Sequence, residues 1–321
     1  MRAGAFESLD VVALAGGVGG AKLAYGLSRL LAPNRFAVIV NTGDDFEHLG
    51  LTICPDLDTV TYTLAERANP ETGWGLVDET FNCLAAVESL GGPAWFRLGD
   101  RDLATHLMRT QALREGARLT EVIEVLAHAM GIAPRILPMT DDICRTQVLT
   151  DEGTLSFQEY FVKRHWQPVV RGFRWEGIER AQPTPEVLAS LKRTDLVVIC
   201  PSNPFVSIDP ILMLPGVREA VREKPAVAVS PILGGDVVKG PAAKMCRELG
   251  VPASAVSVAQ HYEDILDGFV LDAVDRDLIP RVEALGMAAQ AMPTMMKSAE
   301  TRVEVARSVL HFAVTHLVAP G

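Results

Sequence analysis

The chain contains 321 residues, of which 48% are hydrophobic and 22% are charged, which suits a buried core and argues against wholesale disorder. The formal net charge of −10 argues against non-specific binding to nucleic acid or to an anionic membrane. No apolar run reaches the roughly 18 residues of a membrane helix, and the N-terminus lacks a signal-peptide pattern, so we expect a cytoplasmic protein. The five cysteines form no CxxC pair, and we expect them to be free thiols.

The first elements follow the order of a doubly wound fold. Residues 10–15 form an apolar run that predicts a buried parallel strand, and it ends at a glycine-rich loop. Residues 20–31 carry leucines at helical spacing, and residues 37–40 predict the next strand. A strand, a glycine loop, a helix and a second strand begin a Rossmann-like α/β sheet.

The second half of the chain repeats this alternation. Apolar runs at 195–200, 226–229, 256–259 and 269–274 predict further strands, each followed by a turn or a helical segment. Such alternation predicts mostly parallel pairing with right-handed crossovers.

The middle of the chain has a different pattern. Residues 103–130 are helical in pattern, and residues 144–161 alternate around Asp151-Glu152-Gly153 as a β-hairpin does. We therefore expect one α/β domain over residues 1–321, with a helical and β-hairpin insertion at about 62–190 that covers the acceptor site described below.

The loop after the first predicted strand is suited to phosphate. Gly16, Gly17, Gly19 and Gly20 allow the backbone to approach a ligand, and the following helix offers free N–H groups and a partial positive charge, to which Lys22 could add. The spacing is neither a Walker A loop nor a clean GxGxxG, and the second strand lacks the acidic residue of a dinucleotide site. A tight turn without a ligand is the alternative.

Four carboxylates follow the second predicted strand. Asp44 and Asp45 should lie at the same sheet edge as the glycine loop. Carboxylates beside phosphates require a cation between them, and Mg²⁺ is the usual one. Asp56 is a candidate N-cap for a helix at 59–66, and Asp58 would then lie in the first turn of a surface helix, where a functional role competes with a helix-start role.

A cationic segment follows further along the chain. Arg97, Arg101 and His106 surround a glycine, and arginine binds phosphate or carboxylate in a bidentate fork and stacks on flat rings. A surface ion-pair patch and a structural histidine are the alternatives. Trp74 and Trp95 flank the segment as core residues or as stacking residues.

These motifs together suggest a family. The sequence resembles the CofD/FbiA family, the 2-phospho-L-lactate transferases of coenzyme F-420 biosynthesis. The resemblance extends in order over nearly the whole chain and rests on the strings GGVGGA (16–21), VNTGDD (40–45), PDLDTV (55–60), LGDRDLATH (98–106), LPMTDD (137–142), PSNP (201–204) and SPI (230–232).

The resemblance implies a reaction with two substrates. A guanosine diphosphate-linked 2-phospholactate, or its enolpyruvyl counterpart, would donate its phosphoester to the ribityl alcohol of the deazaflavin Fo, with Mg²⁺ required and GMP released. Asp58 and Arg97 would contact the acceptor, and we place Asp100, Arg101 and His106 beside them. Some family members carry lysine in place of Arg97, which changes the hydrogen-bond geometry.

The residues themselves fit that chemistry, because displacement at phosphorus needs positioning and charge neutralisation. Ser202 and Asn203 join the glycine loop as candidate nucleotide-binding residues. Asp44, Asp45 and Asp58 are the candidate Mg²⁺ ligands, and Asp58 is also the candidate to orient the alcohol or to accept its proton.

Two other readings of the sequence compete with this one. A non-catalytic YvcK-like regulator that binds sugar nucleotides would share the glycine loop and the aspartate pair, but it is not expected to carry LGDRD. A nicotinamide-dependent oxidoreductase would need the missing ribose-binding acid. The identity of the three-carbon donor unit and the oligomeric state, for which a homodimer is one option, stay open.

Overall fold

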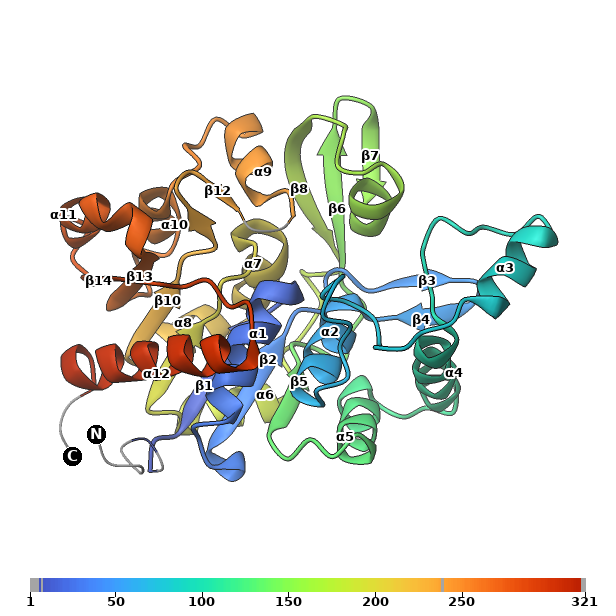
Figure 1. Ribbon diagram of the computed structural model, residues 1–321, viewed down its shortest axis with the longest axis horizontal. Coiled ribbons are helices and arrows are strands. Elements are labelled where there is room, and N and C mark those ends of the chain that lie inside the picture. Colours follow the sequence, from blue (N-terminus) through green and yellow to red (C-terminus); the bar gives the residue numbers. More distant parts are fainter. Residues whose placement is uncertain (1–5, 7, 238–239, 319–321) are drawn as a thin grey trace.

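Among the residues that the computed structural model describes (6, 8–237 and 240–318), seven parallel strands form one central sheet (Figure 1). Their order across the sheet is β14-β13-β10-β9-β1-β2-β5. The doubly wound parallel fold is thereby confirmed. The strands are β1 (Val11–Ala15), β2 (Phe36–Val40), β5 (Arg135–Pro138), β9 (Leu196–Ile199), β10 (Ala226–Val229), β13 (Gly268–Asp272) and β14 (Ala288–Met292).

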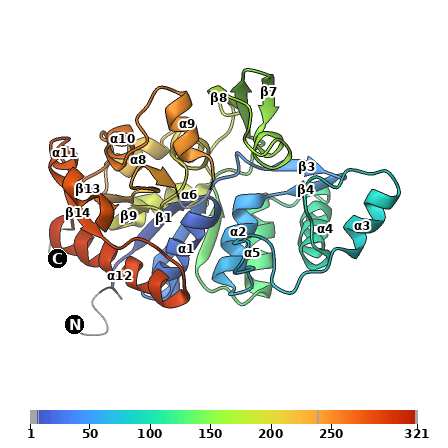
Figure 2. The same cartoon turned by 45° about the horizontal axis from the view of Figure 1, so that its top comes forward.

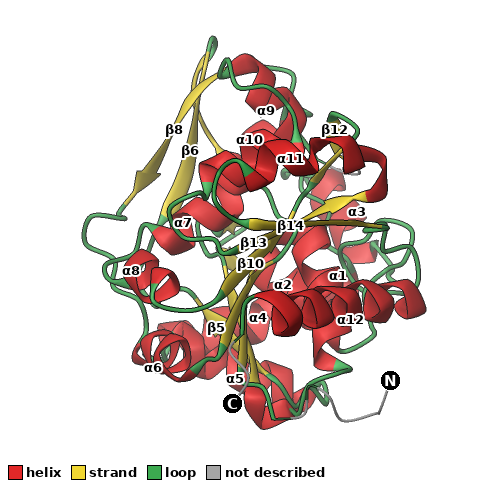
Figure 3. Ribbon diagram, turned by 90° about the vertical axis from the view of Figure 1, so that its left-hand side faces the viewer, coloured by secondary structure: helices red, strands yellow, loops and turns green. Residues whose placement is uncertain are grey.

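Both faces of this sheet are covered by helices, which explains why its central strands are continuous apolar runs. In β1, Val11 and Ala13 pack into one core cluster, whereas Val12 and Leu14 pack into the other. The first cluster is covered by α1 (Gly17–Ser28), α2 (Pro55–Leu64), α5 (Leu119–Ala129) and α12 (Ala299–His316), and the second by α6 (Pro185–Arg193), α8 (Val217–Arg222) and α10 (Ala255–His261), as Figure 3 shows for α12 and α6.

The order of the strands reverses at β1. Chain connections lead from β1 to β2 and β5 in one direction, whereas β9, β10, β13 and β14 follow in the other. In open α/β sheets, ligands bind outside the carboxyl ends of the strands at such a switch point. The loops after β1 and β9 therefore frame the expected crevice.

Two additions extend from the sheet (Figure 2). The first contains the hairpin β3 (Phe46–His48) and β4 (Leu51–Ile53) together with α3 (Asn82–Ser89) and α4 (Asp100–Arg114). The second, called here the hairpin lobe, is the antiparallel sheet of β6 (Arg145–Thr150), β7 (Gly153–Ser156) and β8 (Val170–Glu176) with the π-helical turn Glu159–Lys163.

The predicted hairpin is confirmed, but two expectations need correction and one strand was missed. The proposed insertion at 62–190 is interrupted, because β5 pairs with β2 in the central sheet and α6 packs on that sheet. Residues 256–259 belong to the helix α10 and not to a strand, since Ser254 caps this segment by accepting a hydrogen bond from the Ser257 N–H at 3.2 Å. The alanine-rich β14 was not predicted, because it lacks β-branched residues.

Shorter elements complete the described chain. They are α7 (Asp209–Leu212), α9 (Ala242–Glu248), α11 (Ile279–Glu283), β11 (Ile232–Leu233), β12 (Asp236–Val237), the 3₁₀ turns Pro33–Arg35 and Ala273–Leu278, and the π-helical turn Pro204–Ile208. Within the described ranges, no helix has both the length and the apolar character needed to cross a membrane.

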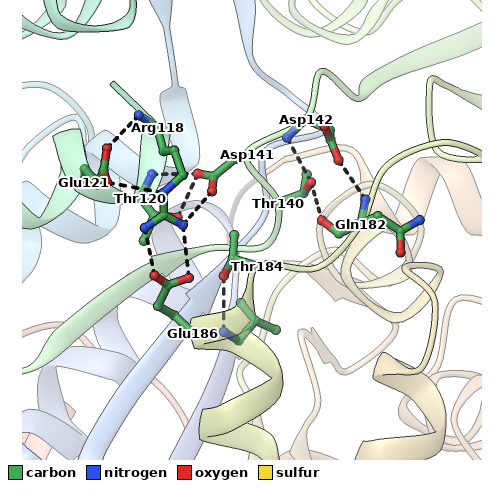
Figure 4. A network of polar contacts seen from close by, with 10 residues as sticks. Arg118, Thr120, Glu121, Thr140, Asp141, Asp142, Gln182, Thr184 and Glu186 are labelled. Atoms are coloured by element: carbon green, nitrogen blue, oxygen red, sulfur yellow. Dashed lines mark hydrogen bonds and ion pairs between the residues drawn. The ribbon is translucent and has the colours of Figure 1, made fainter. Parts of the chain in front are cut away.

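The LPMTDD string anchors the end of β5 (Figure 4). Asp141 accepts hydrogen bonds from the N–H and the hydroxyl of Thr120, both at 2.8 Å, at the start of α5. Asp142 accepts from the N–H of Gln182 at 2.8 Å, and Arg118 bridges Asp141 to Glu186 on α6. The string therefore fastens β5 to the two helices beside it.

Candidate active site

A cavity of about 650 Å³ opens at the carboxyl edge of the sheet, at the point where the strand order reverses. Its volume lies within the range typical of pockets for small molecules. It is lined by the glycine loop, the start of α2, residues of α4, the hairpin lobe, the loops after β9 and β10, and the segment before α12. Motifs that are distant in the sequence thus meet in one space.

The glycine loop packs tightly against the loop after β9. The Ser202 hydroxyl donates to the Gly16 carbonyl at 2.8 Å and accepts from the Gly16 N–H at 3.1 Å. A Cβ at Gly19 would overlap the Pro201 carbonyl oxygen, and one at Gly20 would overlap the Ser202 hydroxyl. These glycines are therefore required by protein packing, independently of any ligand.

Gly17 differs from its neighbours. Its φ of +60° lies in the left-handed region, and a Cβ there would have only the Asp56 carboxylate at 3.6 Å as a close neighbour. It begins α1, whose N-cap Gly16 supplies no side-chain cap, and Gly17, Val18 and Gly19 of the first turn line the cavity.

The other predicted nucleotide-binding residues are distributed unevenly. Gly16, Gly17, Gly19, Lys22, Ser202 and Asn203 line the cavity, whereas Gly20 does not. Asn203 also has a structural task, because its side chain accepts from the Phe205 N–H at 3.1 Å and caps the turn that follows.

Asp44 and Asp56 form a buried carboxylate pair beside the glycine loop, and both line the cavity. The predicted N-cap role of Asp56 is wrong, because Cys54 is the N-cap of α2 and Asp56 lies inside the first turn. Burial raises the pKa of Asp56 to about 6. Burial, and then the charge of Asp56, raises the pKa of Asp44 well above its usual value.

Asn41 connects this pair to the surrounding loops. Its amide donates to Asp56 Oδ2 at 3.0 Å and to the Val206 carbonyl at 3.2 Å, and its Oδ1 accepts from the Gly43 N–H at 2.8 Å. The side chain is fully buried. Asn41 thus holds the loop after β2, the start of α2 and the turn after β9 together.

The donor set at this position fits Mg²⁺ in part. Asp44 Oδ1 is buried without a hydrogen-bond partner among the described residues. The negative charge of Asp56 is close enough to raise the pKa of Asp44. The described residues contain no group of three or more acidic, histidine or cysteine ligands, so a cation here would need water and substrate oxygens as well. Asp45 does not line the cavity, and burial raises its pKa to about 7.

Asp58 lines the cavity but is committed to an internal partner. Both of its oxygens accept hydrogen bonds from the guanidinium of Arg109, one of them at 3.1 Å. Arg109 is completely buried on α4. Burial alone would lower the pKa of Arg109, but the Asp58 carboxylate reverses this effect and the pKa is raised. Asp58 is therefore buried and not part of a surface helix.

A polar chain continues from this ion pair. Since arginine can only donate, His106 Nδ1 accepts from Arg109 Nη1 at 3.2 Å, which leaves the ring proton on Nε2, 3.3 Å from Asp102 Oδ1. Asp102 also accepts from the Tyr62 hydroxyl at 2.6 Å. Asp102, His106 and Arg109 share one face of α4 because they are spaced by four and three residues.

Like His106, Arg97 is a predicted acceptor residue that lines the cavity. Its guanidinium lies over the Phe81 ring, 4.5 Å from the centroid. Trp74 and Trp95 both line the cavity, where Trp95 is held in edge contacts with His48 and Phe96 and Trp74 is partly exposed.

Asp100 and Arg101 do not line the cavity, so the geometry gives no support to their predicted acceptor contact. Asp100 instead accepts from the Thr80 hydroxyl and from the N–H groups of Asn82 and Cys83 at the start of α3. These hydrogen bonds, with Thr80 first, lower the pKa of Asp100 to about 2. The Arg101 guanidinium donates to the Val77 carbonyl at 3.2 Å.

A sequence model described as 2-phospho-L-lactate transferase CofD matches residues 11–309. The chain belongs to this CofD family. A phosphoenolpyruvate transferase from Kitasatospora aureofaciens is 45% identical over 314 residues, covering 95% of this chain and 98% of that protein. A 2-phospho-L-lactate transferase from Methanosarcina mazei is 39% identical over 300 residues, covering 94% and 99%.

A crystal structure of a UPF0052 family member from Bacillus halodurans shares the fold of this CofD family chain, with a TM-score of 0.64 at 16% identity, covering 94% of this chain and 98% of that one. The family model and the Kitasatospora and Methanosarcina relatives are named as transferases, so the chain is an enzyme. The alternative of a non-catalytic regulator is therefore set aside.

The raised carboxyl pKa values predict how stability depends on pH. Asp56 and Asp45 have higher pKa values in the folded than in the unfolded chain, so ionising them costs folded-state stability. The contribution of the two protonated carboxyl groups to folding stability is complete below the ordinary pKa of about 4. It is lost as the pH rises through about 6 for Asp56 and about 7 for Asp45. The melting temperature of chelator-treated protein should therefore decrease by a few degrees between pH 5.5 and 8 relative to an Asp56→Asn variant.

Added Mg²⁺ should restore that loss at pH 8 and have little effect at pH 5.5, because protons then occupy the carboxylates. Asp44→Asn should abolish the response to Mg²⁺, whereas the matched control Asp45→Asn, buried nearby but outside the lining, should retain it. An equal response in all three proteins would contradict the assignment of the cation to Asp44.

Proposed function

We propose that this CofD family chain transfers a 2-phospholactyl or phosphoenolpyruvyl group from a guanosine diphosphate-linked donor to the ribityl alcohol of the deazaflavin Fo, in the cytoplasm, during coenzyme F-420 biosynthesis. The observation that carries the proposal is that the glycine loop and Asp58 line the same cavity. The names of the relatives supply the two candidate three-carbon units.

The proposed step is a displacement at phosphorus. The alcohol oxygen of the acceptor forms a bond to the phosphorus that carries the three-carbon unit. The bond between this phosphorus and the oxygen that bridges to the nucleoside monophosphate breaks, and GMP leaves with that oxygen. The alcohol proton passes to a carboxylate or to water, so that atoms and charge balance.

The charges of the cavity suit an anionic donor beside a neutral acceptor. Among the described residues, Lys22, Arg97 and Lys297 are the cationic side chains other than histidine in its lining, and the first turn of α1 adds the partial positive charge of a helix N-terminus. Asp44 and Asp56 would hold Mg²⁺, which would neutralise charge on the phosphate oxygens when bound. Without a cation, these two carboxylates would repel the donor.

Asp58 is suited to orient the acceptor alcohol. A carboxylate has about four lone-pair positions, and Arg109 uses two of them, so the others can accept a hydrogen bond from an alcohol in the cavity. The Arg109 guanidinium supplies the counter-charge and restricts the rotation of the carboxylate. We infer that Asp58 positions the alcohol and serves as the candidate acceptor of its proton.

The function is tested by the mass of the product. Purified protein with Mg²⁺ and Fo should convert one donor of the guanosine diphosphate-linked series into GMP and an Fo derivative that is heavier by the phosphorylated three-carbon unit. Donors built on phospholactate, phosphoenolpyruvate and 3-phosphoglycerate should be compared separately. Absence of any adduct with all three donors would overturn the proposal.

Asp58→Asn removes the charge while preserving the shape of the side chain. The transfer rate should decrease by roughly a hundredfold or more, the range expected when a group that orients or deprotonates the nucleophile is lost. The melting temperature should also decrease, because Arg109 is left as a buried unpaired charge, which typically costs about 3–5 kcal/mol.

A double variant separates the two effects. Asp58→Asn combined with Arg109→Met should recover much of the stability, because no unpaired charge remains, but it should not recover transfer. If the double variant recovers the melting temperature and also turns over within about threefold of the parent, Asp58 has no part in the chemical step.

A further inference from the structure

A row of aromatic rings runs through the hairpin lobe to the cavity. Phe157 and Phe161 are stacked with ring centroids 5.5 Å apart and planes 7° apart. Phe161 and Trp166 continue the row at 5.3 Å and 28°. All three residues line the cavity, although none belongs to a string that marks the family resemblance.

The row becomes more exposed towards Trp166. Phe157 is 7% exposed and belongs to the buried cluster of the lobe, whereas Trp166 is 40% exposed. Among the described residues, Trp166 has a ring contact with Phe161 alone. A tryptophan that served only the core of the lobe would be more deeply buried, since its large apolar surface is its main contribution to stability.

The backbone holds Trp166 in an unusual conformation. His165 and Trp166 have φ values of 49° and 46°, which residues other than glycine rarely adopt. The Trp166 N–H donates to the Tyr160 carbonyl at 2.9 Å, and Arg164 is ion-paired with Glu152 across the lobe. Consecutive left-handed residues of this kind cluster at ligand clamps, where the surrounding structure maintains the strain.

We propose that Phe157, Phe161 and Trp166 form a stacking platform for the planar heteroaromatic ring of a substrate. The proposal rests on the proposed function, whose substrates each carry such a ring, the guanine of the donor and the deazaflavin of the acceptor. A flat ring added to the end of the row would cover the exposed part of Trp166 and extend an offset stack. Stacking of this kind tolerates different rings because each has a π-face.

The platform is tested by calorimetric titration with guanosine diphosphate alone and with Fo alone. Trp166→Ala should weaken the affinity for one of these ligands by roughly five- to a hundredfold and leave the other within about twofold. Trp166→Phe should retain most of the affinity, because a ring remains. The ligand that responds identifies the ring held by the platform.

Lys163→Ala is the matched control. It ends the π-helical turn just before Trp166, its side chain is ion-paired with Glu159 on the surface, and it does not line the cavity, so both affinities should match those of the parent. Melting temperatures establish that each variant is folded. If Trp166→Ala binds both ligands like the folded parent, the platform is wrong and the proposed function stands. If the parent binds neither ligand, the proposed function and the platform both fall.

Discussion

The close contact between the loops after β1 and β9 is the constraint on which the rest of the site depends. Ser202 hydrogen-bonds both backbone groups of Gly16, and the space for a Cβ at Gly19 and Gly20 is occupied by the second loop. The contact directs the N-terminus of α1 into the crevice at the point where the strand order reverses. Asn41 extends the same construction to α2, because its amide reaches both Asp56 and the turn after β9.

The carboxylates of the cavity are neutralised in two different ways. Asp58 receives its counter-charge from within the protein, through the buried guanidinium of Arg109. Asp56 and Asp44 are held by the neutral amide of Asn41, and burial raises the pKa of each. The first arrangement suits a neutral alcohol that must be oriented, and the second suits an external cation that accompanies a charged donor. The asymmetry follows from the positions of the carboxylates and agrees with a transfer between an anionic and a neutral substrate.

Local patterns predicted much of the sheet and the central loop, because apolar runs and glycines have direct backbone consequences. The sequence did not disclose Arg109, since a lone arginine on a polar helix has no signal until its spacing to Asp102 and His106 is considered. Asp100 belongs to the LGDRDLATH string, but it accepts hydrogen bonds from the first N–H groups of α3. This role depends on how α3 and α4 pack together and has no signal in the local sequence. Asp56 resembled a helix cap because the actual N-cap, Cys54, lacks a capping side chain. These misassignments share one cause, since tertiary contacts decide the role of a polar residue.

A crystal structure of the protein with Mg²⁺, guanosine diphosphate and Fo bound together would test most directly whether one cavity brings donor and acceptor together. We expect the diphosphate at the first turn of α1, the cation between it and Asp44, and the ribityl alcohol within hydrogen-bond distance of Asp58. A nucleotide bound away from the glycine loop, or Fo bound outside the cavity with Asp58 still paired only to Arg109, would contradict the claim that one cavity brings donor and acceptor together.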